Sequence, residues 1–227
     1  MFVQLESRRR PRPPWATLVL VCTCVATFLW IVAQPIGERA RLLSLWGTVP
    51  TTLLDPSVAW ATQLAELRFA RLVTALFIHA DWIHLTTNLL FLIIFGVPAE
   101  RALGAGRFLI LFVVGGALAN LAGALSLAAV SSPIIGSSGA VSGVVGAYLA
   151  LYPRARLGLV LPLGFFLEFV RVPASLLIGF WAVVQILFTY VGPAFGAVAW
   201  WTHIAGFLLG ILFAVMWRPG LARRARQ

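Results

Sequence analysis

Two residues of this chain have the side chains that nucleophilic catalysis requires. Ser138 lies in the run Gly136–Gly139, at the start of an apolar stretch, and His203 lies near the start of another apolar stretch. Serine is a weak nucleophile until a base takes its proton. A neutral imidazole can do so near physiological pH, because its unperturbed pKa is about 6.5. The pair therefore predicts a nucleophile and its general base.

Other polar residues could stabilise the oxyanion that such a reaction forms. His84 and Asn88 are four residues apart, so on a helix they share one face. Their side-chain N–H groups and the backbone N–H of Ser138 are suitable oxyanion donors. A carboxylate that would complete a triad is harder to find, because Asp81 precedes His84 and is expected nearer to the water. The prediction is a Ser–His dyad, with His84 and Asn88 in the oxyanion or substrate-binding site.

The composition places these groups in a membrane protein. Of the 227 residues, 61% are hydrophobic and 11% are charged, and the mean hydropathy is +0.96. Soluble domains are about 45–50% apolar and about 25% charged. The net charge of +10 comes from arginine alone, spread over both tails and short loops, so no basic face for nucleic acid is expected. Cys22 and Cys24, two residues apart in one apolar stretch, are not expected to form a disulfide or a metal site.

Six stretches are candidates for membrane spans, each of which needs roughly 20 mostly apolar residues. Two further apolar stretches, Leu42–Leu54 and Leu157–Leu167, are interrupted by Gly and Pro and are expected at the membrane interface. The six predicted spans are Ala16–Ala33, Ile83–Pro98, Phe108–Ala128, Gly136–Leu151, Val172–Val191 and Trp200–Trp217.

Arginine indicates the orientation, because basic residues are enriched in cytoplasmic loops. With six crossings, most arginines fall on one side; only the long first loop carries arginines on the other, together with acidic residues. The expectation is a multi-pass protein of a bacterial inner membrane. Residues 1–15 form a basic cytoplasmic tail, 16–217 the six-span domain and 218–227 a second basic cytoplasmic tail. The first apolar run, about 18 residues long, favours a span over a cleaved signal peptide.

This topology brings the polar residues to one depth. Spans two, four and six run in the same direction, and His84, Asn88, Ser138 and His203 all lie near their outer ends. Buried ionisable groups in a membrane usually face a cavity or a partner. Two G-x-x-x-G patterns, at 139–143 and 206–210, predict close packing of spans four and six, which would carry the histidine to the serine.

The motifs of this chain resemble those of the rhomboid intramembrane serine proteases. The segment from Arg71 to Asn88 is similar to the family's R-x-x-T-x-x-F-x-H…H-x-x-x-N, and Phe95 begins an F-G-x-x-x-E. The G-x-S-G around Ser138 and the H-x-x-G-x-x-x-G that starts at His203 complete the match. The resemblance implies a six-helix core, with Ser138 as nucleophile and His203 as base. It implies as well that His84 and Asn88 line the oxyanion site. It also implies transmembrane protein substrates cut near their outer ends, and no cofactor or metal.

Three positions depart from the family pattern. Ala70 stands where many members have tryptophan, and Thr202 where alanine is common. Ser142 stands where some members stack an aromatic ring on the base. The sequence therefore leaves open which group orients His203.

Two other functions fit the sequence less well than proteolysis does. A catalytically silent rhomboid-like protein that binds transmembrane partners would usually lack the serine or the histidine, and both are present. A transporter or channel predicts polar groups along the whole bilayer depth, but the inner halves of the spans are almost purely apolar. The expected surroundings are a lipid bilayer and transmembrane substrates, with no nucleic acid; the oligomeric state is not readable from the sequence.

Overall fold

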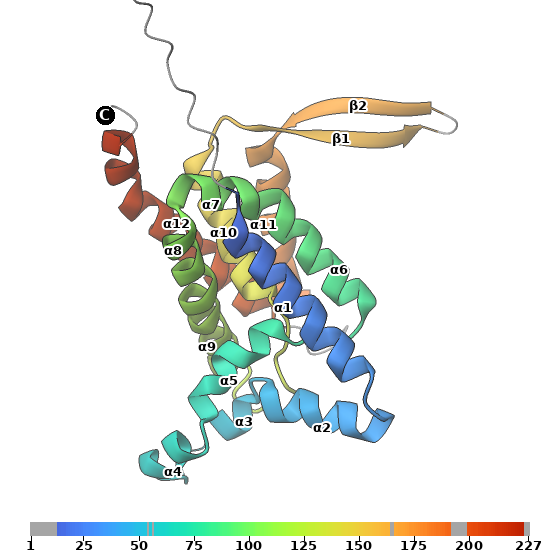
Figure 1. Ribbon diagram of the computed structural model, residues 1–227, viewed down its shortest axis with the longest axis vertical. Coiled ribbons are helices and arrows are strands. Elements are labelled where there is room, and N and C mark those ends of the chain that lie inside the picture. Colours follow the sequence, from blue (N-terminus) through green and yellow to red (C-terminus); the bar gives the residue numbers. More distant parts are fainter. Residues whose placement is uncertain (1–12, 54, 56, 164–165, 192–198, 225–227) are drawn as a thin grey trace, which may run out of the picture.

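A computed structural model describes residues 13–53, 55, 57–163, 166–191 and 199–224 of the chain. Its helices form a bundle, with a group of short helices at one end and a β-hairpin projecting from the other (Figure 1). The elements are α1 (Trp15–Val32), α2 (Ile36–Trp46), α3 (Pro50–Leu53), α4 (Trp60–Ala65), α5 (Arg71–Thr74), α6 (Trp82–Phe91), α7 (Val97–Leu103), α8 (Ala105–Ile110), α9 (Gly116–Ser126), α10 (Ser138–Leu151), β1 (Arg156–Leu163), β2 (Phe166–Pro173), α11 (Ala174–Val191) and α12 (Trp200–Arg224).

Five helices are long and apolar enough to cross a membrane. Three of them are α1, α11 and the part of α12 up to Trp217. The other two are composite: a π-helical segment joins α6 to α7 in Trp82–Leu103, and another joins α8 to α9 in Ala105–Ser126. The remaining predicted span, the fourth along the chain, is the shorter apolar helix α10, of 14 residues. The predicted all-α membrane bundle is confirmed, with one span shorter than expected.

Helix α10 is short because it lies inside the bundle. Every residue from Gly139 to Tyr148 is buried, on all faces of the helix. A helix that is apolar all round is expected in such a place. It packs against α12, α9, α7, α6 and α11, and its central valines belong to the main hydrophobic core. Ser138, at its first position, is therefore held by the most enclosed element of the fold.

The start of α1 is tied to α7 by a buried carboxylate. Glu100 accepts hydrogen bonds from the backbone N–H of Ala16 at 3.0 Å and of Thr17 at 2.7 Å, and from the Thr17 hydroxyl at 2.7 Å. The first N–H groups of a helix have no partner within it, and they carry the positive end of its dipole. A carboxylate there satisfies both needs and fixes where the first span begins.

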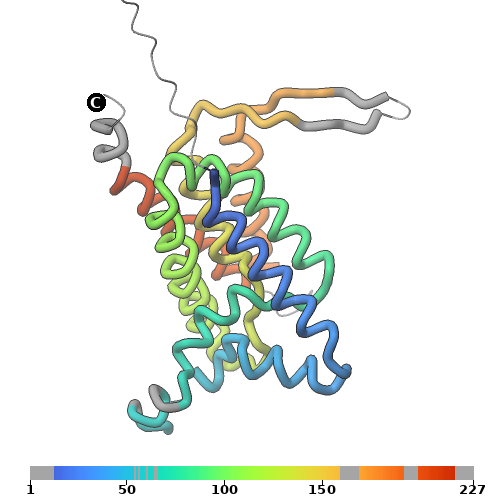
Figure 2. Tube along the Cα trace, viewed as in Figure 1, coloured from blue at the N-terminus to red at the C-terminus, as the bar shows by residue number. Residues whose placement is uncertain are grey.

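The long first loop folds into short helices across one end of the bundle, as the cyan and teal trace in Figure 2 shows. Leu42–Leu54, expected at the interface, falls mainly within α2 and α3. Between those helices Thr48 pairs with Ile134 through two backbone hydrogen bonds of 3.0 and 2.8 Å. The loop thereby holds the segment that leads into α10.

The stretch Leu157–Leu167, expected at the membrane interface, falls on the two strands of a β-hairpin. Strands β1 and β2 pair antiparallel, with Arg156 opposite Pro173. Eleven apolar residues cannot cross a bilayer, and pairing gives their backbone groups partners within the segment. Because β2 runs to Pro173, the fifth span begins at Ala174 and the predicted start at Val172 was two residues early. Residues 164–165 at the hairpin tip lie outside the described residues.

The ends of the bundle follow the order expected for an even number of passes. Helix α1 begins, and α12 ends, at the end of the bundle that carries the hairpin (Figure 1). Helices α6, α10 and α12 begin at the opposite end and run toward the hairpin. The residues in the first turns of these three helices can therefore meet.

Candidate active site

Ser138 is presented by a sharp turn ahead of α10. Gly136 has a φ of +106°, and a Cβ at this position would overlap the ring of His84. Only glycine meets both conditions, since left-handed backbone and the absence of a side chain are both required. The Gly136 N–H donates to the carbonyl of Ala75 at 2.9 Å, which attaches the turn to the segment before α6. The helix then starts at Ser138, two residues later than predicted.

A buried histidine supports this turn from behind. His79 is 1% exposed, and its Nε2 lies 3.2 Å from the hydroxyl of Ser137, the neighbour of the candidate nucleophile. Burial, and after it the nearby His84, lower the pKa of His79 to about 4. The His79 ring is therefore neutral at physiological pH, and its position behind the turn gives it a structural part in the site.

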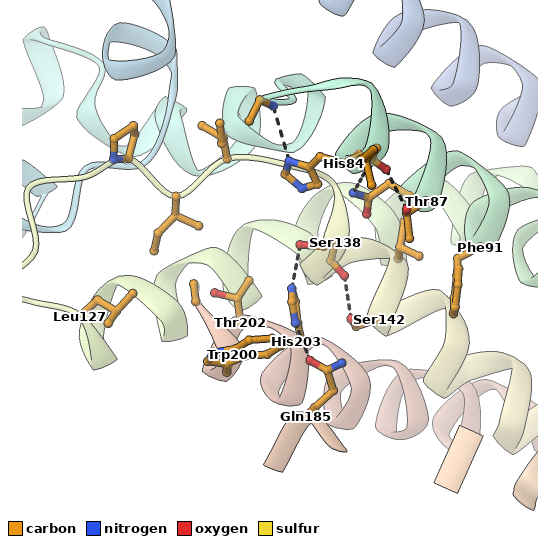
Figure 3. A pocket seen from close by; sticks show the side chains of 18 of the residues that line it. His84, Thr87, Phe91, Leu127, Ser138, Ser142, Gln185, Trp200, Thr202 and His203 are labelled. Carbon is orange, nitrogen blue, oxygen red and sulfur yellow. Dashed lines mark hydrogen bonds between the residues drawn. The ribbon is translucent and has the colours of Figure 1, made fainter. Parts of the chain in front are cut away.

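His203 is brought to Ser138 by close packing of α10 and α12. The backbones approach so closely that a Cβ at Gly206 would overlap the carbonyl of Gly139, and one at Gly210 the carbonyl of Gly143. The predicted role of the two G-x-x-x-G patterns in helix packing is confirmed. With the helices in this contact, His203 Nε2 lies 2.9 Å from Ser138 Oγ (Figure 3).

The second nitrogen of His203 has a partner that the sequence analysis missed. Gln185, on α11, places its Oε1 2.8 Å from His203 Nδ1. A polar residue deep in an otherwise apolar span is a signal that could have singled it out, because such residues are costly in a membrane. Nothing in the sequence tells which of the other helices its side chain faces.

His84 and Asn88 stand on the other side of Ser138, on α6. Asp81 caps this helix by accepting from the His84 N–H at 2.8 Å, so its carboxylate serves the helix end and not His203. The side-chain nitrogen of Asn88 donates to the His84 carbonyl at 2.8 Å, within the same helix. An amide nitrogen carries two hydrogens, so one donor of Asn88 remains for a ligand.

These groups share a cavity of about 560 Å³. Ser138, His203, Gln185, His84 and Asn88 all line it, among mostly apolar side chains (Figure 3). Its size and composition are typical of a ligand site, in which a few polar groups converge on an apolar wall. An open nucleophile beside a base and several N–H donors can perform acyl transfer. Among the described residues, no three His, Cys, Asp or Glu side chains are close enough together to hold a metal ion.

The departures from the expected pattern have visible consequences at two positions. Ser142 donates its hydroxyl to the backbone carbonyl of Ser138 at 2.7 Å, so it does not cover the His203 ring. The Trp200 ring does lie near this ring, nearly perpendicular to it, with 5.8 Å between the ring centres. Thr202 is 2% exposed and packs against Gly123 and Gly139, so its larger side chain fills space between helices.

Comparison with known proteins gives one family. The model of the Rhomboid domain matches residues 66–220. Rhomboid-related protein 3 of Homo sapiens is 33% identical over 138 residues, which are 61% of this chain and 32% of the relative. Rhomboid protease GluP of Bacillus subtilis is 36% identical over 130 residues, 56% of this chain and 25% of the relative. Rhomboid protease GlpG of Serratia proteamaculans is 27% identical over 215 residues, 94% of this chain and 66% of the relative. The chain thus spans about a third of the length of the human relative and a quarter of that of GluP.

Proposed function

Because this chain belongs to the rhomboid family, we propose that it is a serine endopeptidase that hydrolyses peptide bonds in or near the transmembrane segments of other membrane proteins. The observation that carries the proposal is the 2.9 Å contact between His203 Nε2 and Ser138 Oγ, on the wall of a cavity between membrane helices. Two of the relatives, the rhomboid proteases GluP and GlpG, support the same activity.

The proposed reaction proceeds by acyl transfer in two steps. Ser138 Oγ attacks the substrate carbonyl carbon while His203 Nε2 takes the hydroxyl proton. The imidazolium then protonates the leaving amine, and an ester between Ser138 and the substrate remains. In the second step His203 takes a proton from water, the hydroxide attacks the ester, and the proton returns to Ser138 Oγ. Proton transfer by such a base typically contributes about 10²–10⁴ in rate.

The donors for the oxyanion are placed on the side of Ser138 that faces α6. His84, half-buried, and Asn88, 6% exposed, both line the cavity. The Ser138 backbone N–H is a third donor, because the first N–H groups of a helix have no partner within it. We assign all three to the oxyanion and to the carbonyl of the bound substrate.

The membrane setting determines the class of substrate. The cavity is surrounded by helices whose outward faces are apolar. On α11, for example, Leu176, Phe180, Val183 and Tyr190 are exposed. A substrate that reaches Ser138 from within the bilayer must itself be apolar, as a transmembrane segment is. We take the tails and the hairpin to be cytoplasmic, since basic residues are enriched on that side of a membrane, and therefore expect the cut near the outer end of the substrate helix.

The proposal is tested with purified protein in liposomes and a model transmembrane substrate. Wild-type protein should release two fragments whose masses give the cut position, and Ser138→Ala should release none. Ser126→Ala removes another helix hydroxyl, which bonds only its own helix at Gly123, and should cleave like wild type. Equal product from Ser138→Ala would rule out the assigned role. Wild-type protein that binds the substrate without cleaving it would indicate a silent family member.

Removing one oxyanion donor should slow the reaction without ending it. We expect Asn88→Ala to lower kcat by about 10²-fold or less, since one donor is typically worth about 10²–10³ and the other donors remain. Thr86→Val, on the exposed side of the same helix and bonded to the helix backbone, is the matched control and should change little. An unchanged kcat for Asn88→Ala would remove that residue from the oxyanion site.

A further inference from the structure

Gln185 is the one polar side chain on the buried face of α11. Most of this helix is exposed or half-buried, and its buried residues are Ala174, Ile178 and Gln185. Their spacings of four and seven residues put them on one face. An amide in an apolar environment without a hydrogen bond costs several kcal/mol by transfer measurements. A residue of this kind on the packed face of a membrane helix therefore needs a partner, and its partner is the candidate base.

The contact between Gln185 and His203 has a defined polarity. The atom that lies 2.8 Å from His203 Nδ1 is the amide oxygen, which can only accept. Nδ1 therefore carries the ring hydrogen, and in the neutral ring the lone pair is on Nε2. That lone pair is directed at Ser138 Oγ, 2.9 Å away. Figure 3 shows the three side chains in a row, from α10 through α12 to α11.

We infer that Gln185 is the positioning residue of the active site: it holds the His203 ring in the tautomer that can accept the Ser138 proton. The inference rests on the function proposed above. The alternatives for this task are weaker, since Ser142 is bonded to the Ser138 carbonyl and the Trp200 ring stands nearly perpendicular to the imidazole and does not stack on it. Gln185 on α11 is thus the residue that orients the base. In other members the aromatic ring would stand at the position of Ser142, on α10.

The same contact acts on the charged ring. When His203 takes the proton, Nδ1–H becomes a donor of a cationic group, and hydrogen bonds to charged groups are stronger than neutral ones. The amide oxygen stabilises this imidazolium without a charge of its own. Among the described residues that line the cavity, the only other titratable side chain is His84 on α6. Within the described part of the chain, Ser138 from α10, Trp200 from α12 and Gln185 from α11 also lie against the ring.

Three variants measure the role of the amide. Gln185→Leu keeps a similar volume and removes the acceptor, and we expect kcat to fall roughly 10- to 100-fold with little change in KM. Gln185→Glu supplies a carboxylate, which favours the imidazolium, so the acid limb of the pH–rate profile should move up by about one pH unit or more. Thr189→Val is the matched control on the same helix, because among the described residues its hydroxyl bonds only the backbone of Ile186. It should keep the wild-type kcat and pH profile.

A spectroscopic readout separates this inference from the activity itself. The chain has three histidines, so ¹⁵N-histidine labelling gives few ring signals, assigned by single substitutions. Wild-type protein at mildly alkaline pH should show His203 protonated at Nδ1, and Gln185→Leu should shift the ring toward the other tautomer. Should Gln185→Leu not fold, as judged by its melting temperature in detergent, Gln185→Met takes its place.

The outcomes distinguish the two proposals. Absence of cleavage that depends on Ser138 in wild-type protein would overturn the enzyme, while the tautomer measurement would still report on Gln185. Cleavage that depends on Ser138, together with an unchanged kcat, pH profile and ring tautomer in Gln185→Leu, would overturn the positioning role. A loss confined to KM, or an equal loss in Thr189→Val, would assign Gln185 to packing and overturn it as well.

Discussion

Ser138→Ala and His203→Ala should each lower kcat by about 10⁴-fold or more. The double variant should have a kcat no lower than that of the more impaired single variant. The reason is that nucleophile and base act as one unit. Without the imidazole the hydroxyl keeps its proton, and without the hydroxyl the imidazole has nothing to activate. The measurement is a cycle of wild type, two single variants and the double variant, with the same transmembrane substrate in liposomes and the same protein-to-lipid ratio.

One result of this mutant cycle would contradict the dyad. If the two losses multiplied, the residues would act independently, and the 2.9 Å contact between them would not be the catalytic one. The KM of each single variant should stay close to that of wild type, because neither side chain is needed to admit the substrate. Melting temperatures in detergent show whether any variant has lost its fold.

Adding one methyl group at Gly210 should destabilise the protein and reduce its activity together. In Gly210→Ala the new Cβ would overlap the backbone of Gly143, and no side chain can turn away to make room. Helices α10 and α12 must then separate. Overpacking of this kind typically costs 1–3 kcal/mol and occasionally more. The free energy of unfolding, from denaturant titration in mixed micelles, and the cleavage rate should both fall, because the shift moves His203 away from Ser138.

Gly179→Ala is the matched control for this substitution. Gly179 also lies inside an apolar helix, α11, but no atom lies within 4 Å of the position that a Cβ would take. Alanine is a better helix former than glycine by up to about 1 kcal/mol, so this variant should be as stable as wild type or more stable. Equal stability and activity of Gly210→Ala and wild type would show that α10 and α12 do not depend on the close contact at Gly210.

The elements that the sequence predicted well are those with a strong local signal. Apolar runs of the right length predicted the membrane helices, since the bilayer requires that length of any span. The predicted ends of the helices were less accurate. Helix α10 starts at Ser138 and not at Gly136, because Gly136 has a positive φ and so cannot belong to a right-handed helix. The hairpin at 156–173 was missed, since pairing with a neighbouring strand is not encoded in the hydropathy of either strand alone.

The site itself divides in the same way. Residue types and shared helix direction were enough to select Ser138, His203, His84 and Asn88, and the structure brings all four to one cavity. Their assigned roles await the experiments above. The sequence could have marked Gln185 as a polar residue in an apolar span, but not its contact with His203, because that contact depends on the rotation of α11 about its own axis. That rotation is decided by the packing of α11 on α12, and hydropathy along an almost uniformly apolar helix carries little information about it.

The amino-acid sequence alone therefore determined that this chain lies in a membrane as a bundle of helices, and that the candidate reactive side chains gather at one end of that bundle. These properties follow from hydrophobic length and from the alternation of direction between successive helices. Only the tertiary structure decided the distances between side chains on different helices. Close approach at the glycines sets the separation of Ser138 and His203, and the buried face of α11 supplies the third polar group. Such contacts depend on how several helices fit together, which no single stretch of sequence specifies.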